Sequence, residues 1–172
     1  MSFKDVTANK NFLSPLGFKF VLTRLPNVEY FCQSVRLPEV SLDVAISPNP
    51  FQPIKLPGTK LSFGTLRVTF KVDEDLKNYL EIFDWMDALA ITDSFDGYRE
   101  LANQPVVSDK KPLSDGSLVI LTSSKNPRHQ ATFIDMFPVS LSSLDFSSTL
   151  SDVDYVEATV EFEYRRFYLT LI

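Results

Sequence analysis

The chain lacks the residues from which most metal centres and nucleophilic sites are built. Its 172 residues include one cysteine, Cys32, and one histidine, His129. A single cysteine excludes an intrachain disulfide framework. One cysteine and one histidine are also too few for a zinc site with His and Cys ligands. Catalytic arrangements that need two histidines, or a cysteine with a second histidine, are excluded as well. We expect no metal and no cofactor.

Glycine and long apolar runs are also scarce. The five glycines are scattered, so no glycine-rich phosphate loop is present. No apolar run approaches the roughly 20 residues that a membrane-spanning helix needs. The first residues, 1–5, are not followed by an apolar signal core, and position 2 is not the glycine that myristoylation requires. We therefore expect a cytosolic start and no membrane segment.

Positive charge is missing from one long segment. Residues 131–164 contain no Lys or Arg but carry seven carboxylates, in a chain whose total net charge is -5. The rest of the chain is therefore net +2, since -5 minus -7 is +2. One interpretation is a solvated acidic face, and the other is a surface that repels polyanions or meets a basic partner. The acidic total argues against tight nucleic-acid binding.

Aromatic residues are plentiful, at 13% of the chain, within an ordinary 44% of hydrophobic residues. This composition excludes disorder and can supply a large core, with aromatic surface left over for partners. The length indicates a single domain over 1–172, with residues 1–14 as a flexible polar arm.

Alternation of apolar and polar residues predicts most of the strands. A strand over 18–23, a turn at Pro26-Asn27 and a strand from Tyr30 to Leu37 look like a hairpin. Leu66 to Lys71 is the clearest half-buried strand of the first half. Later strands are expected at Ser117–Ser123, at Gln130–Phe137 with a break at Pro138, and at Val156–Tyr164, where Glu157, Thr159, Glu161 and Glu163 face away from the apolar positions.

Residues 38–64 are unusual because five of the eleven prolines lie between Pro38 and Pro57. Such a stretch cannot be a central strand or a helix. Its apolar residues are too many for a free linker, and four of them alternate as in a strand. We expect a projecting proline-rich arm that packs on another subunit through Val40, Leu42, Val44, Ile46, Phe51 and Ile54.

One strong helix is expected, over residues 73–91. Asp73 is placed to cap it, with Glu74 and Asp75 in the first turn, where the helix dipole favours acids. Residues 92–117 look polar and loop-rich. The helix should pack on the strands through Leu76, Tyr79, Leu80, Phe83, Trp85 and Met86.

These elements predict a mainly β fold: an antiparallel β-sandwich or barrel of two packed sheets with one flanking α-helix. Catalytic chemistry is weakly represented. His129 lies in a turn-like segment, Cys32 looks like a buried inert thiol, and Asp152 and Asp154 lack the glycine loop of a calcium site. We expect no enzyme, although a site made of carboxylates alone stays open, as does a β-sandwich module that binds a sugar or peptide.

The order of these segments resembles the tail tube protein family of contractile-tailed bacteriophages, which has an Hcp-like tube fold. The resemblance runs from Phe18 to Tyr164. It rests on Gln33–Pro38 before the arm, on Leu66–Lys71 leading into an acid-capped helix with Phe83-Asp84-Trp85, and on Asp135–Ser140, Leu144–Ser147 and the last strand. The apolar extension at 165–172 departs from the family, whose chains usually end soon after that strand.

The resemblance implies a structural virion protein that forms stacked hexameric rings, with the sheath protein outside and baseplate and neck tube-end proteins at the two ends. Phage DNA would pass through the bore transiently and without sequence preference, and an acidic bore would let it slide. Glu157, Glu161 and Glu163 are the candidate bore-lining residues. The expected location is the virion, and the host cytoplasm during assembly. A tube initiator, a terminator or the tube of a contractile injection system are the alternatives within this class.

Overall fold

Strand β7 (Pro127–Leu141) joins the two layers of the fold in the computed structural model, which describes residues 12–90, 95–103, 112–146 and 155–172. Its first half pairs with β6 and β9, and its end pairs with β8, all antiparallel. The other elements are β1 (Phe18–Leu22), α1 (Pro26–Tyr30), β2 (Cys32–Arg36), β3 (Val40–Ser47), β4 (Ile54–Phe63), β5 (Leu66–Lys71), α2 (Lys77–Ala90), α3 (Asp96–Asn103), β6 (Ser114–Leu121), β8 (Glu157–Glu163) and β9 (Arg166–Leu171).

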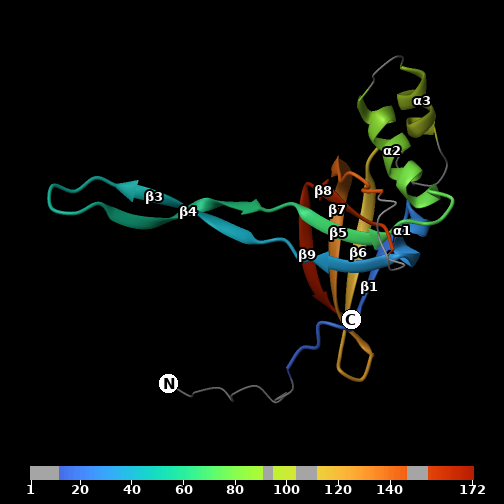
Figure 1. The fold of residues 1–172 in the computed structure, drawn as a ribbon. Coiled ribbons are helices and arrows are strands. Elements are labelled where there is room, and N and C mark those ends of the chain that lie inside the picture. Colours follow the sequence, from blue (N-terminus) through green and yellow to red (C-terminus); the bar gives the residue numbers. More distant parts are fainter. Residues whose placement is uncertain (1–11, 91–94, 104–111, 147–154) are drawn as a thin grey trace.

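The body is one seven-stranded sheet with strand order β1-β6-β7-β8-β5-β2, and β9 is also paired to β7. One layer consists of β1, β6, β9 and the first half of β7, and the other of β2, β5, β8 and the end of β7. Figure 1 shows β3 and β4 extending to one side of this body and α2 and α3 on another. The predicted class, a mainly β antiparallel sandwich, is confirmed.

The core lies between the layers and is rich in aromatic residues. On β5 and β8, every second side chain points inward, as predicted. Leu66 pairs with Phe162 and Val68 with Val160, and all four side chains are fully buried. Burying one such large apolar side chain contributes about 1.5–3 kcal/mol. The largest fully buried side chains are Phe20, Phe70, Phe133 and Phe162.

An irregularity at Asp135 helps β7 to serve both layers. Asp135 adopts a left-handed φ of 56°, so the two buried residues beside it, Phe133 and Met136, are three positions apart rather than two. The predicted break at Pro138 is wrong, since the strand continues to Leu141. Pro138 is tolerated because β6 pairs with β7 only as far as Met136, so β8 is the one strand paired there.

The predicted hairpin of 18–23 with Tyr30–Leu37 is wrong. β1 pairs with β6 and β2 pairs with β5, so the two strands lie in different layers. The predicted turn at Pro26 is instead the start of α1. Proline suits this position, because the first N–H groups of a helix have no partner within the helix. Val28 of this helix is fully buried and anchors the crossing from one layer to the other.

Helix α2 begins at Lys77, four residues later than predicted, and Asp73 does not cap it. Leu76 has a φ of 57°, which stops the helix from extending towards Asp73. The turn before it is held by Asn78, a buried residue whose side-chain Nδ2 donates to the Lys71 carbonyl at 2.8 Å and whose Oδ1 accepts from the Asp73 N–H at 3.2 Å.

The buried face of α2 also differs from the prediction. Asn78, Ile82 and Trp85 point into the core, and Tyr79 and Met86 pack against it. Three side chains expected to pack there are exposed: Leu76, Leu80 and Phe83. The helix has apolar side chains on two sides, and either side could face the core. The side that carries Trp85 is the buried one, and there Trp85 Nε1 donates to the Pro112 carbonyl at 3.0 Å.

Two further segments take up structure that the sequence did not indicate. Helix α3 lies inside the stretch expected to be loop-rich. The apolar extension at 165–172 contains β9, which pairs along β7 from Ile134 to His129 and adds the buried Phe167 to the core. Residues 1–11 of the expected flexible arm, and both Asp152 and Asp154, lie outside the described residues.

Candidate functional site

Conventional reactive groups do not gather in the described part of the chain. No cluster of His, Cys, Asp or Glu there could hold a metal ion. None of the described helices is long and apolar enough to cross a membrane. Cys32 is half-buried, and burial raises the pKa of its thiol to about 11, so the thiol stays protonated at neutral pH. The surfaces of the molecule carry the candidate sites.

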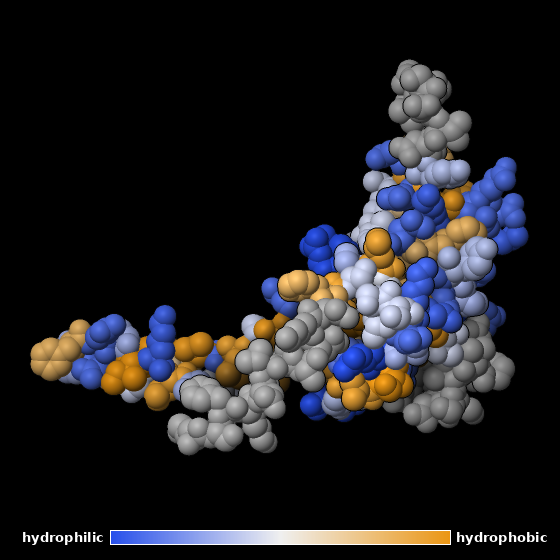
Figure 2. All heavy atoms as spheres, turned by 90° about the horizontal axis from the view of Figure 1, so that it is seen from below, coloured by the Kyte–Doolittle hydropathy of each residue, from blue (hydrophilic) through white to orange (hydrophobic). Residues whose placement is uncertain are grey.

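The first candidate is the hairpin of β3 and β4, which stands away from the body (Figure 1). Almost every one of its side chains is exposed, including four of the predicted contact residues on β3. Figure 2 shows apolar atoms along the length of this hairpin. A two-stranded hairpin alone is at best marginally stable in water, so its apolar atoms need cover from elsewhere.

One face of the hairpin is largely apolar. Val40 pairs with Phe63, Leu42 with Leu61 and Val44 with Pro57, and residues that pair directly lie on the same face. Ile46 continues the row opposite Lys55 and is 65% exposed. The opposite face has the polar pair of Ser41 and Ser62 near the root, and the pairs of Ala45 with Leu56 and Ser47 with Ile54 nearer the tip. The predicted residues Val40, Leu42, Val44 and Ile46 thus share one surface, which we call the ribbon face.

A close backbone approach fixes the register at the middle of the hairpin. A Cβ atom on Gly58 would lie 2.5 Å from the Asp43 carbonyl oxygen, closer than atoms can pack. The strand register shifts at this point, between Leu42 and Val44. The Asp43 carboxylate accepts a hydrogen bond from the Val44 N–H at 2.8 Å. Glycine at position 58 is therefore a steric requirement of this pairing.

The root of the hairpin is tied to the core. The Gly64 N–H donates to the Glu39 carbonyl at 3.0 Å across the bend, and the Tyr164 hydroxyl donates to the Gly64 carbonyl at 2.7 Å. Phe63 packs edge-on against Phe167, with ring centroids 5.4 Å apart. Burial, with a smaller contribution from the charge of Glu163, raises the pKa of Tyr164 to about 12, so the hydroxyl remains a donor.

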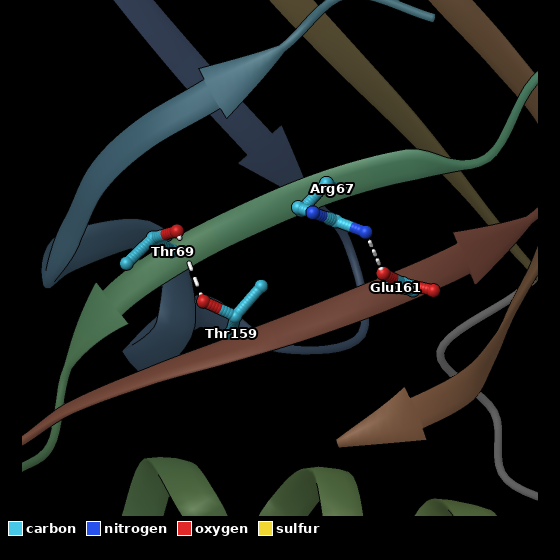
Figure 3. A network of polar contacts seen from close by, with 4 residues as sticks. All are labelled: Arg67, Thr69, Thr159 and Glu161. Atoms are coloured by element: carbon cyan, nitrogen blue, oxygen red, sulfur yellow. Dashed lines mark hydrogen bonds and ion pairs between the residues drawn. The ribbon is translucent and has the colours of Figure 1, made fainter. Parts of the chain in front are cut away.

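The second candidate is the outward face of β5 and β8, which carries the predicted acidic residues. Figure 3 shows Arg67 pairing with Glu161 across the two strands, and the hydroxyls of Thr69 and Thr159 hydrogen-bonded at 3.1 Å. The Thr159 N–H also donates to the Ser142 Oγ at 2.9 Å. These contacts hold the outer side chains in defined positions.

The 131–164 segment by itself suggests a strongly acidic face, but the folded face also carries cations from other strands. Glu157 lies opposite Lys71, and Arg36 of β2 lies beside Arg67 in the same rung as Glu161. Lys71 also lies over the Tyr155 ring, 4.3 Å from its centroid. The acidity of β8 is offset because its partner strands supply the cations. The three carboxylates, Glu157, Glu161 and Glu163, therefore share this face with three cations.

Sequence reasoning missed those cations, although a signal for them existed. Arg67 and Lys71 occupy the polar positions of the strand predicted over 66–71. Only the pairing of β5 with β8 shows that they face the carboxylates. A second group was also missed: Leu61 and Phe63 at the end of the returning strand β4, where no alternation was identified.

Solved structures with the same fold come from contractile machines. The tube-terminating cap of the anti-feeding prophage matches over 100% of both chains, with a TM-score of 0.66 and 13% sequence identity. The sheath and tube terminator of the PVC extracellular contractile injection system matches with a TM-score of 0.63 and 15% identity, over 95% of this chain and 99% of the other. The PVC sheath-tube complex contains a chain that matches at 0.61 and 16% identity, over 95% and 94%.

The sequence itself identifies the family. No curated protein sequence matches the chain. The family described as phage tail tube protein matches residues 4–170, which include the hairpin, both layers of the body and all but the end of β9. Because the match spans nearly the whole chain and the fold agrees with it, the chain belongs to the phage tail tube protein family.

Proposed function

We propose that the protein is the repeating subunit of the inner tube of a contractile phage tail, and that it assembles into stacked hexameric rings. The observation that carries the proposal is the ribbon face: a row of apolar side chains on a projecting hairpin, half or more exposed in the single chain. In a member of the tail tube family, the natural cover for this face is a neighbouring subunit. Val40, Leu42, Val44, Ile46, Phe51 and Ile54 are the proposed contact residues.

Open strand edges support the same arrangement. Among the described strands, β1 and β2 end the order of the seven-stranded sheet and pair on one side only. Exposed edges favour pairing with another chain unless they are covered. Joining such edges around a ring gives a continuous barrel without free edges. The ring closure proposed here uses these edges together with the hairpin.

The outward face of β5 and β8 is the proposed lining of the bore, with Glu157, Glu161 and Glu163 on it. Arg67 and Lys71 on the same face keep its charge balanced rather than strongly acidic. A balanced surface with an internal ion pair offers DNA phosphates few free cations, so little counterion release would favour binding. Viral DNA would then pass without being held.

The exposed stripe of α2 is the proposed contact with the surrounding sheath. Leu80 and Phe83 lie three residues apart on the helix and are exposed, and Asp84 and Asp87 extend the same side. Aliphatic and acidic groups together suit a partner that presents apolar and basic side chains. Baseplate and neck proteins would contact the ends of the tube. The role is structural, within the virion, with assembly in the host cytoplasm.

A ring at the end of the tube is the second candidate. The anti-feeding prophage cap shares the fold along its full length, so nothing in the size of this chain separates a terminator from a repeating subunit. The two roles differ in growth: a repeating subunit forms long tubes, whereas a terminator forms single rings. The tube of a contractile injection system would share the same architecture and differ in its cargo.

Electron microscopy of the purified protein in negative stain, with light scattering on the same sample, tests the proposal. We expect rings or tubes of constant width with a central channel. Val44→Asp on the ribbon face should abolish them while the circular dichroism spectrum stays unchanged. Ser41→Asp, on the opposite face of the same strand, is the matched control and should still assemble. A chain that stays monomeric at high concentration, and also with baseplate or initiator present, would contradict the proposal.

A further inference from the structure

The tip of the hairpin presents a single aromatic side chain in a stiffened loop. Phe51 lies between β3 and β4 and is 98% exposed. Its N–H donates to the Asn49 Oδ1 at 3.1 Å, and Pro50 and Pro53 flank it. Side-chain turns of this kind, together with proline, restrict the loop before it meets any partner. A rigid exposed ring is the form in which proteins present an anchor for a pocket, because little entropy is lost on docking.

An apolar cavity lies at the far end of β5 from this hairpin. Its volume is about 680 Å3, and its walls include Phe31, Val72, Leu76 and Tyr155. Asp73 and Glu74 also line it. Tyr155 and Leu76 are 67% and 37% exposed, so the apolar wall is open to solvent in the single chain. We call this space the β5-end cavity. Its size falls within the range of protein sites that bury one compact group.

The tip and the cavity are placed for a head-to-tail contact. The hairpin leaves the body where β5 begins, because β4 ends at Phe63 and β5 starts at Leu66. The cavity opens where β5 ends, at Lys71 and the residues that follow it. A contact between opposite ends of one element joins different surfaces of two copies. Such contacts repeat in one direction and generate closed rings or open stacks.

Charge supports the same pairing. Lys55 follows the tip loop closely and is exposed, and Lys60 lies farther down the same strand. The cavity carries Asp73 and Glu74 beside its apolar wall, and these two carboxylates outnumber its one cation, Lys71, which lies over the Tyr155 ring. The partner is thus expected to bring an apolar ring and a nearby cation, which the hairpin tip does. Opposite charges at the edge of an apolar contact fix its orientation.

We propose that Phe51 of one copy docks into the β5-end cavity of a neighbouring copy, with Lys55 beside Asp73 and Glu74. The inference rests on the proposed function and deepens it, since it names the surface that receives the hairpin. It makes the contact heterologous: every subunit donates one tip and accepts one.

Disulfide trapping tests the contact directly, in chains that carry Cys32→Ala. Chains with Phe51→Cys are mixed with chains with Tyr155→Cys, assembled and oxidised. We expect a disulfide-linked dimer, and a ladder of multimers from the chain that carries both changes. A mixture of Phe51→Cys with Leu171→Cys is the control, because Leu171 is 72% exposed and lies on β9. Assembled rings without a dimer above that control would overturn the docking site.

A charge exchange covers the case in which loss of the Phe51 ring prevents assembly. Lys55→Glu and Glu74→Lys should each raise the concentration needed for assembly at least tenfold, and the chain with both should recover. Lys60→Glu on the same strand should have a smaller effect. Full assembly of both single variants, or no recovery in the double variant, would overturn the proposal. If the unaltered chain forms no rings at all, the proposed function fails first and this inference falls with it.

Discussion

The hairpin and the body are built from the same alternating strands, yet they stand in opposite relations to solvent. On β5 and β8, every second side chain is fully buried between two layers. On β3, the same alternation of Val, Leu and Ile leaves side chains that are half exposed or more. Period-two alternation therefore predicts a strand with an apolar face, and says nothing about which chain covers that face.

This difference separates two kinds of stability. The body contains its own core and should unfold as a unit when that core is damaged. The ribbon face contributes little to the stability of the single chain, because its side chains stay half exposed or more. In the proposed assembly, a neighbouring subunit would cover this apolar area. Substitutions in the two regions should therefore separate folding from association.

The largest effect on folding is expected from the centre of the body. Phe162 is fully buried and packs near Trp85, with ring centroids 6.2 Å apart. Phe162→Ala should lower the free energy of unfolding by about 3–5 kcal/mol, because it leaves a cavity. Val44→Ala on the ribbon face should change the same quantity by less than about 0.5 kcal/mol. Denaturant unfolding of both variants as monomers measures the contrast, and equal losses would contradict it.

A buried hydrogen-bonding group should rank next. Asn78 is fully buried and holds the turn between β5 and α2 through the Lys71 carbonyl and the Asp73 N–H. Asn78→Ala should cost about 1–3 kcal/mol, since it leaves two backbone groups without their partner. The measurement is again the unfolding free energy. The exposed neighbour Lys77, changed to Ala, serves as the control and should leave that free energy nearly unchanged.

A pair of glycines makes the comparison sharper. A Cβ on Gly116 would lie 2.6 Å from the Met136 Sδ inside the core, and one on Gly58 would meet the Asp43 carbonyl in the hairpin. Gly116→Ala should destabilise the monomer by about 1 kcal/mol as the methionine repacks. Gly58→Ala should leave monomer unfolding unchanged and weaken assembly, followed by light scattering. A loss of monomer stability in the Gly58 variant would show that the hairpin folds with the body.

The smallest effect is expected at the ion pair on the outer face. Arg67 and Glu161 are both partly exposed, so their coupling should be about 0.2–1 kcal/mol and should shrink as salt is added. A double-mutant cycle with Arg67→Gln and Glu161→Gln, run at low and high salt, measures it. Coupling that is independent of salt would indicate a pair shielded from solvent, which the exposure of Arg67 contradicts.

The sequence predicted the strands better than their partners. Leu66–Lys71 and the last strand were identified because a half-buried strand records its burial in its own alternation. The hairpin of 18–23 with Tyr30–Leu37 failed because pairing depends on distant strands, β6 and β5, that local pattern does not reveal. The face of α2 failed because the helix is apolar on both sides, and the hydrogen bond of Trp85 to Pro112 selects one.

The candidate site shows the same division. The ribbon face could be predicted because its four alternating residues and the surrounding prolines are local features. The charge of the outer β8 face could not, because Arg67 and Lys71 come from another strand about ninety residues away in the chain. Their effect on the carboxylates depends on register, which only the folded structure supplies.

The tie at the root of the hairpin has a geometric consequence for any assembly of these chains. Gly64, Tyr164 and Phe63 clamp one end of a long, narrow ribbon and leave the other end free. The hairpin is thus fixed at its root, so a small rotation at the aromatic cluster would displace the tip by a larger distance. Repacking Phe63 would change the direction of the hairpin without changing its length. In the proposed assembly, the side chains at the root would therefore set the direction of the hairpin, and those along the ribbon face would set the strength of the contact.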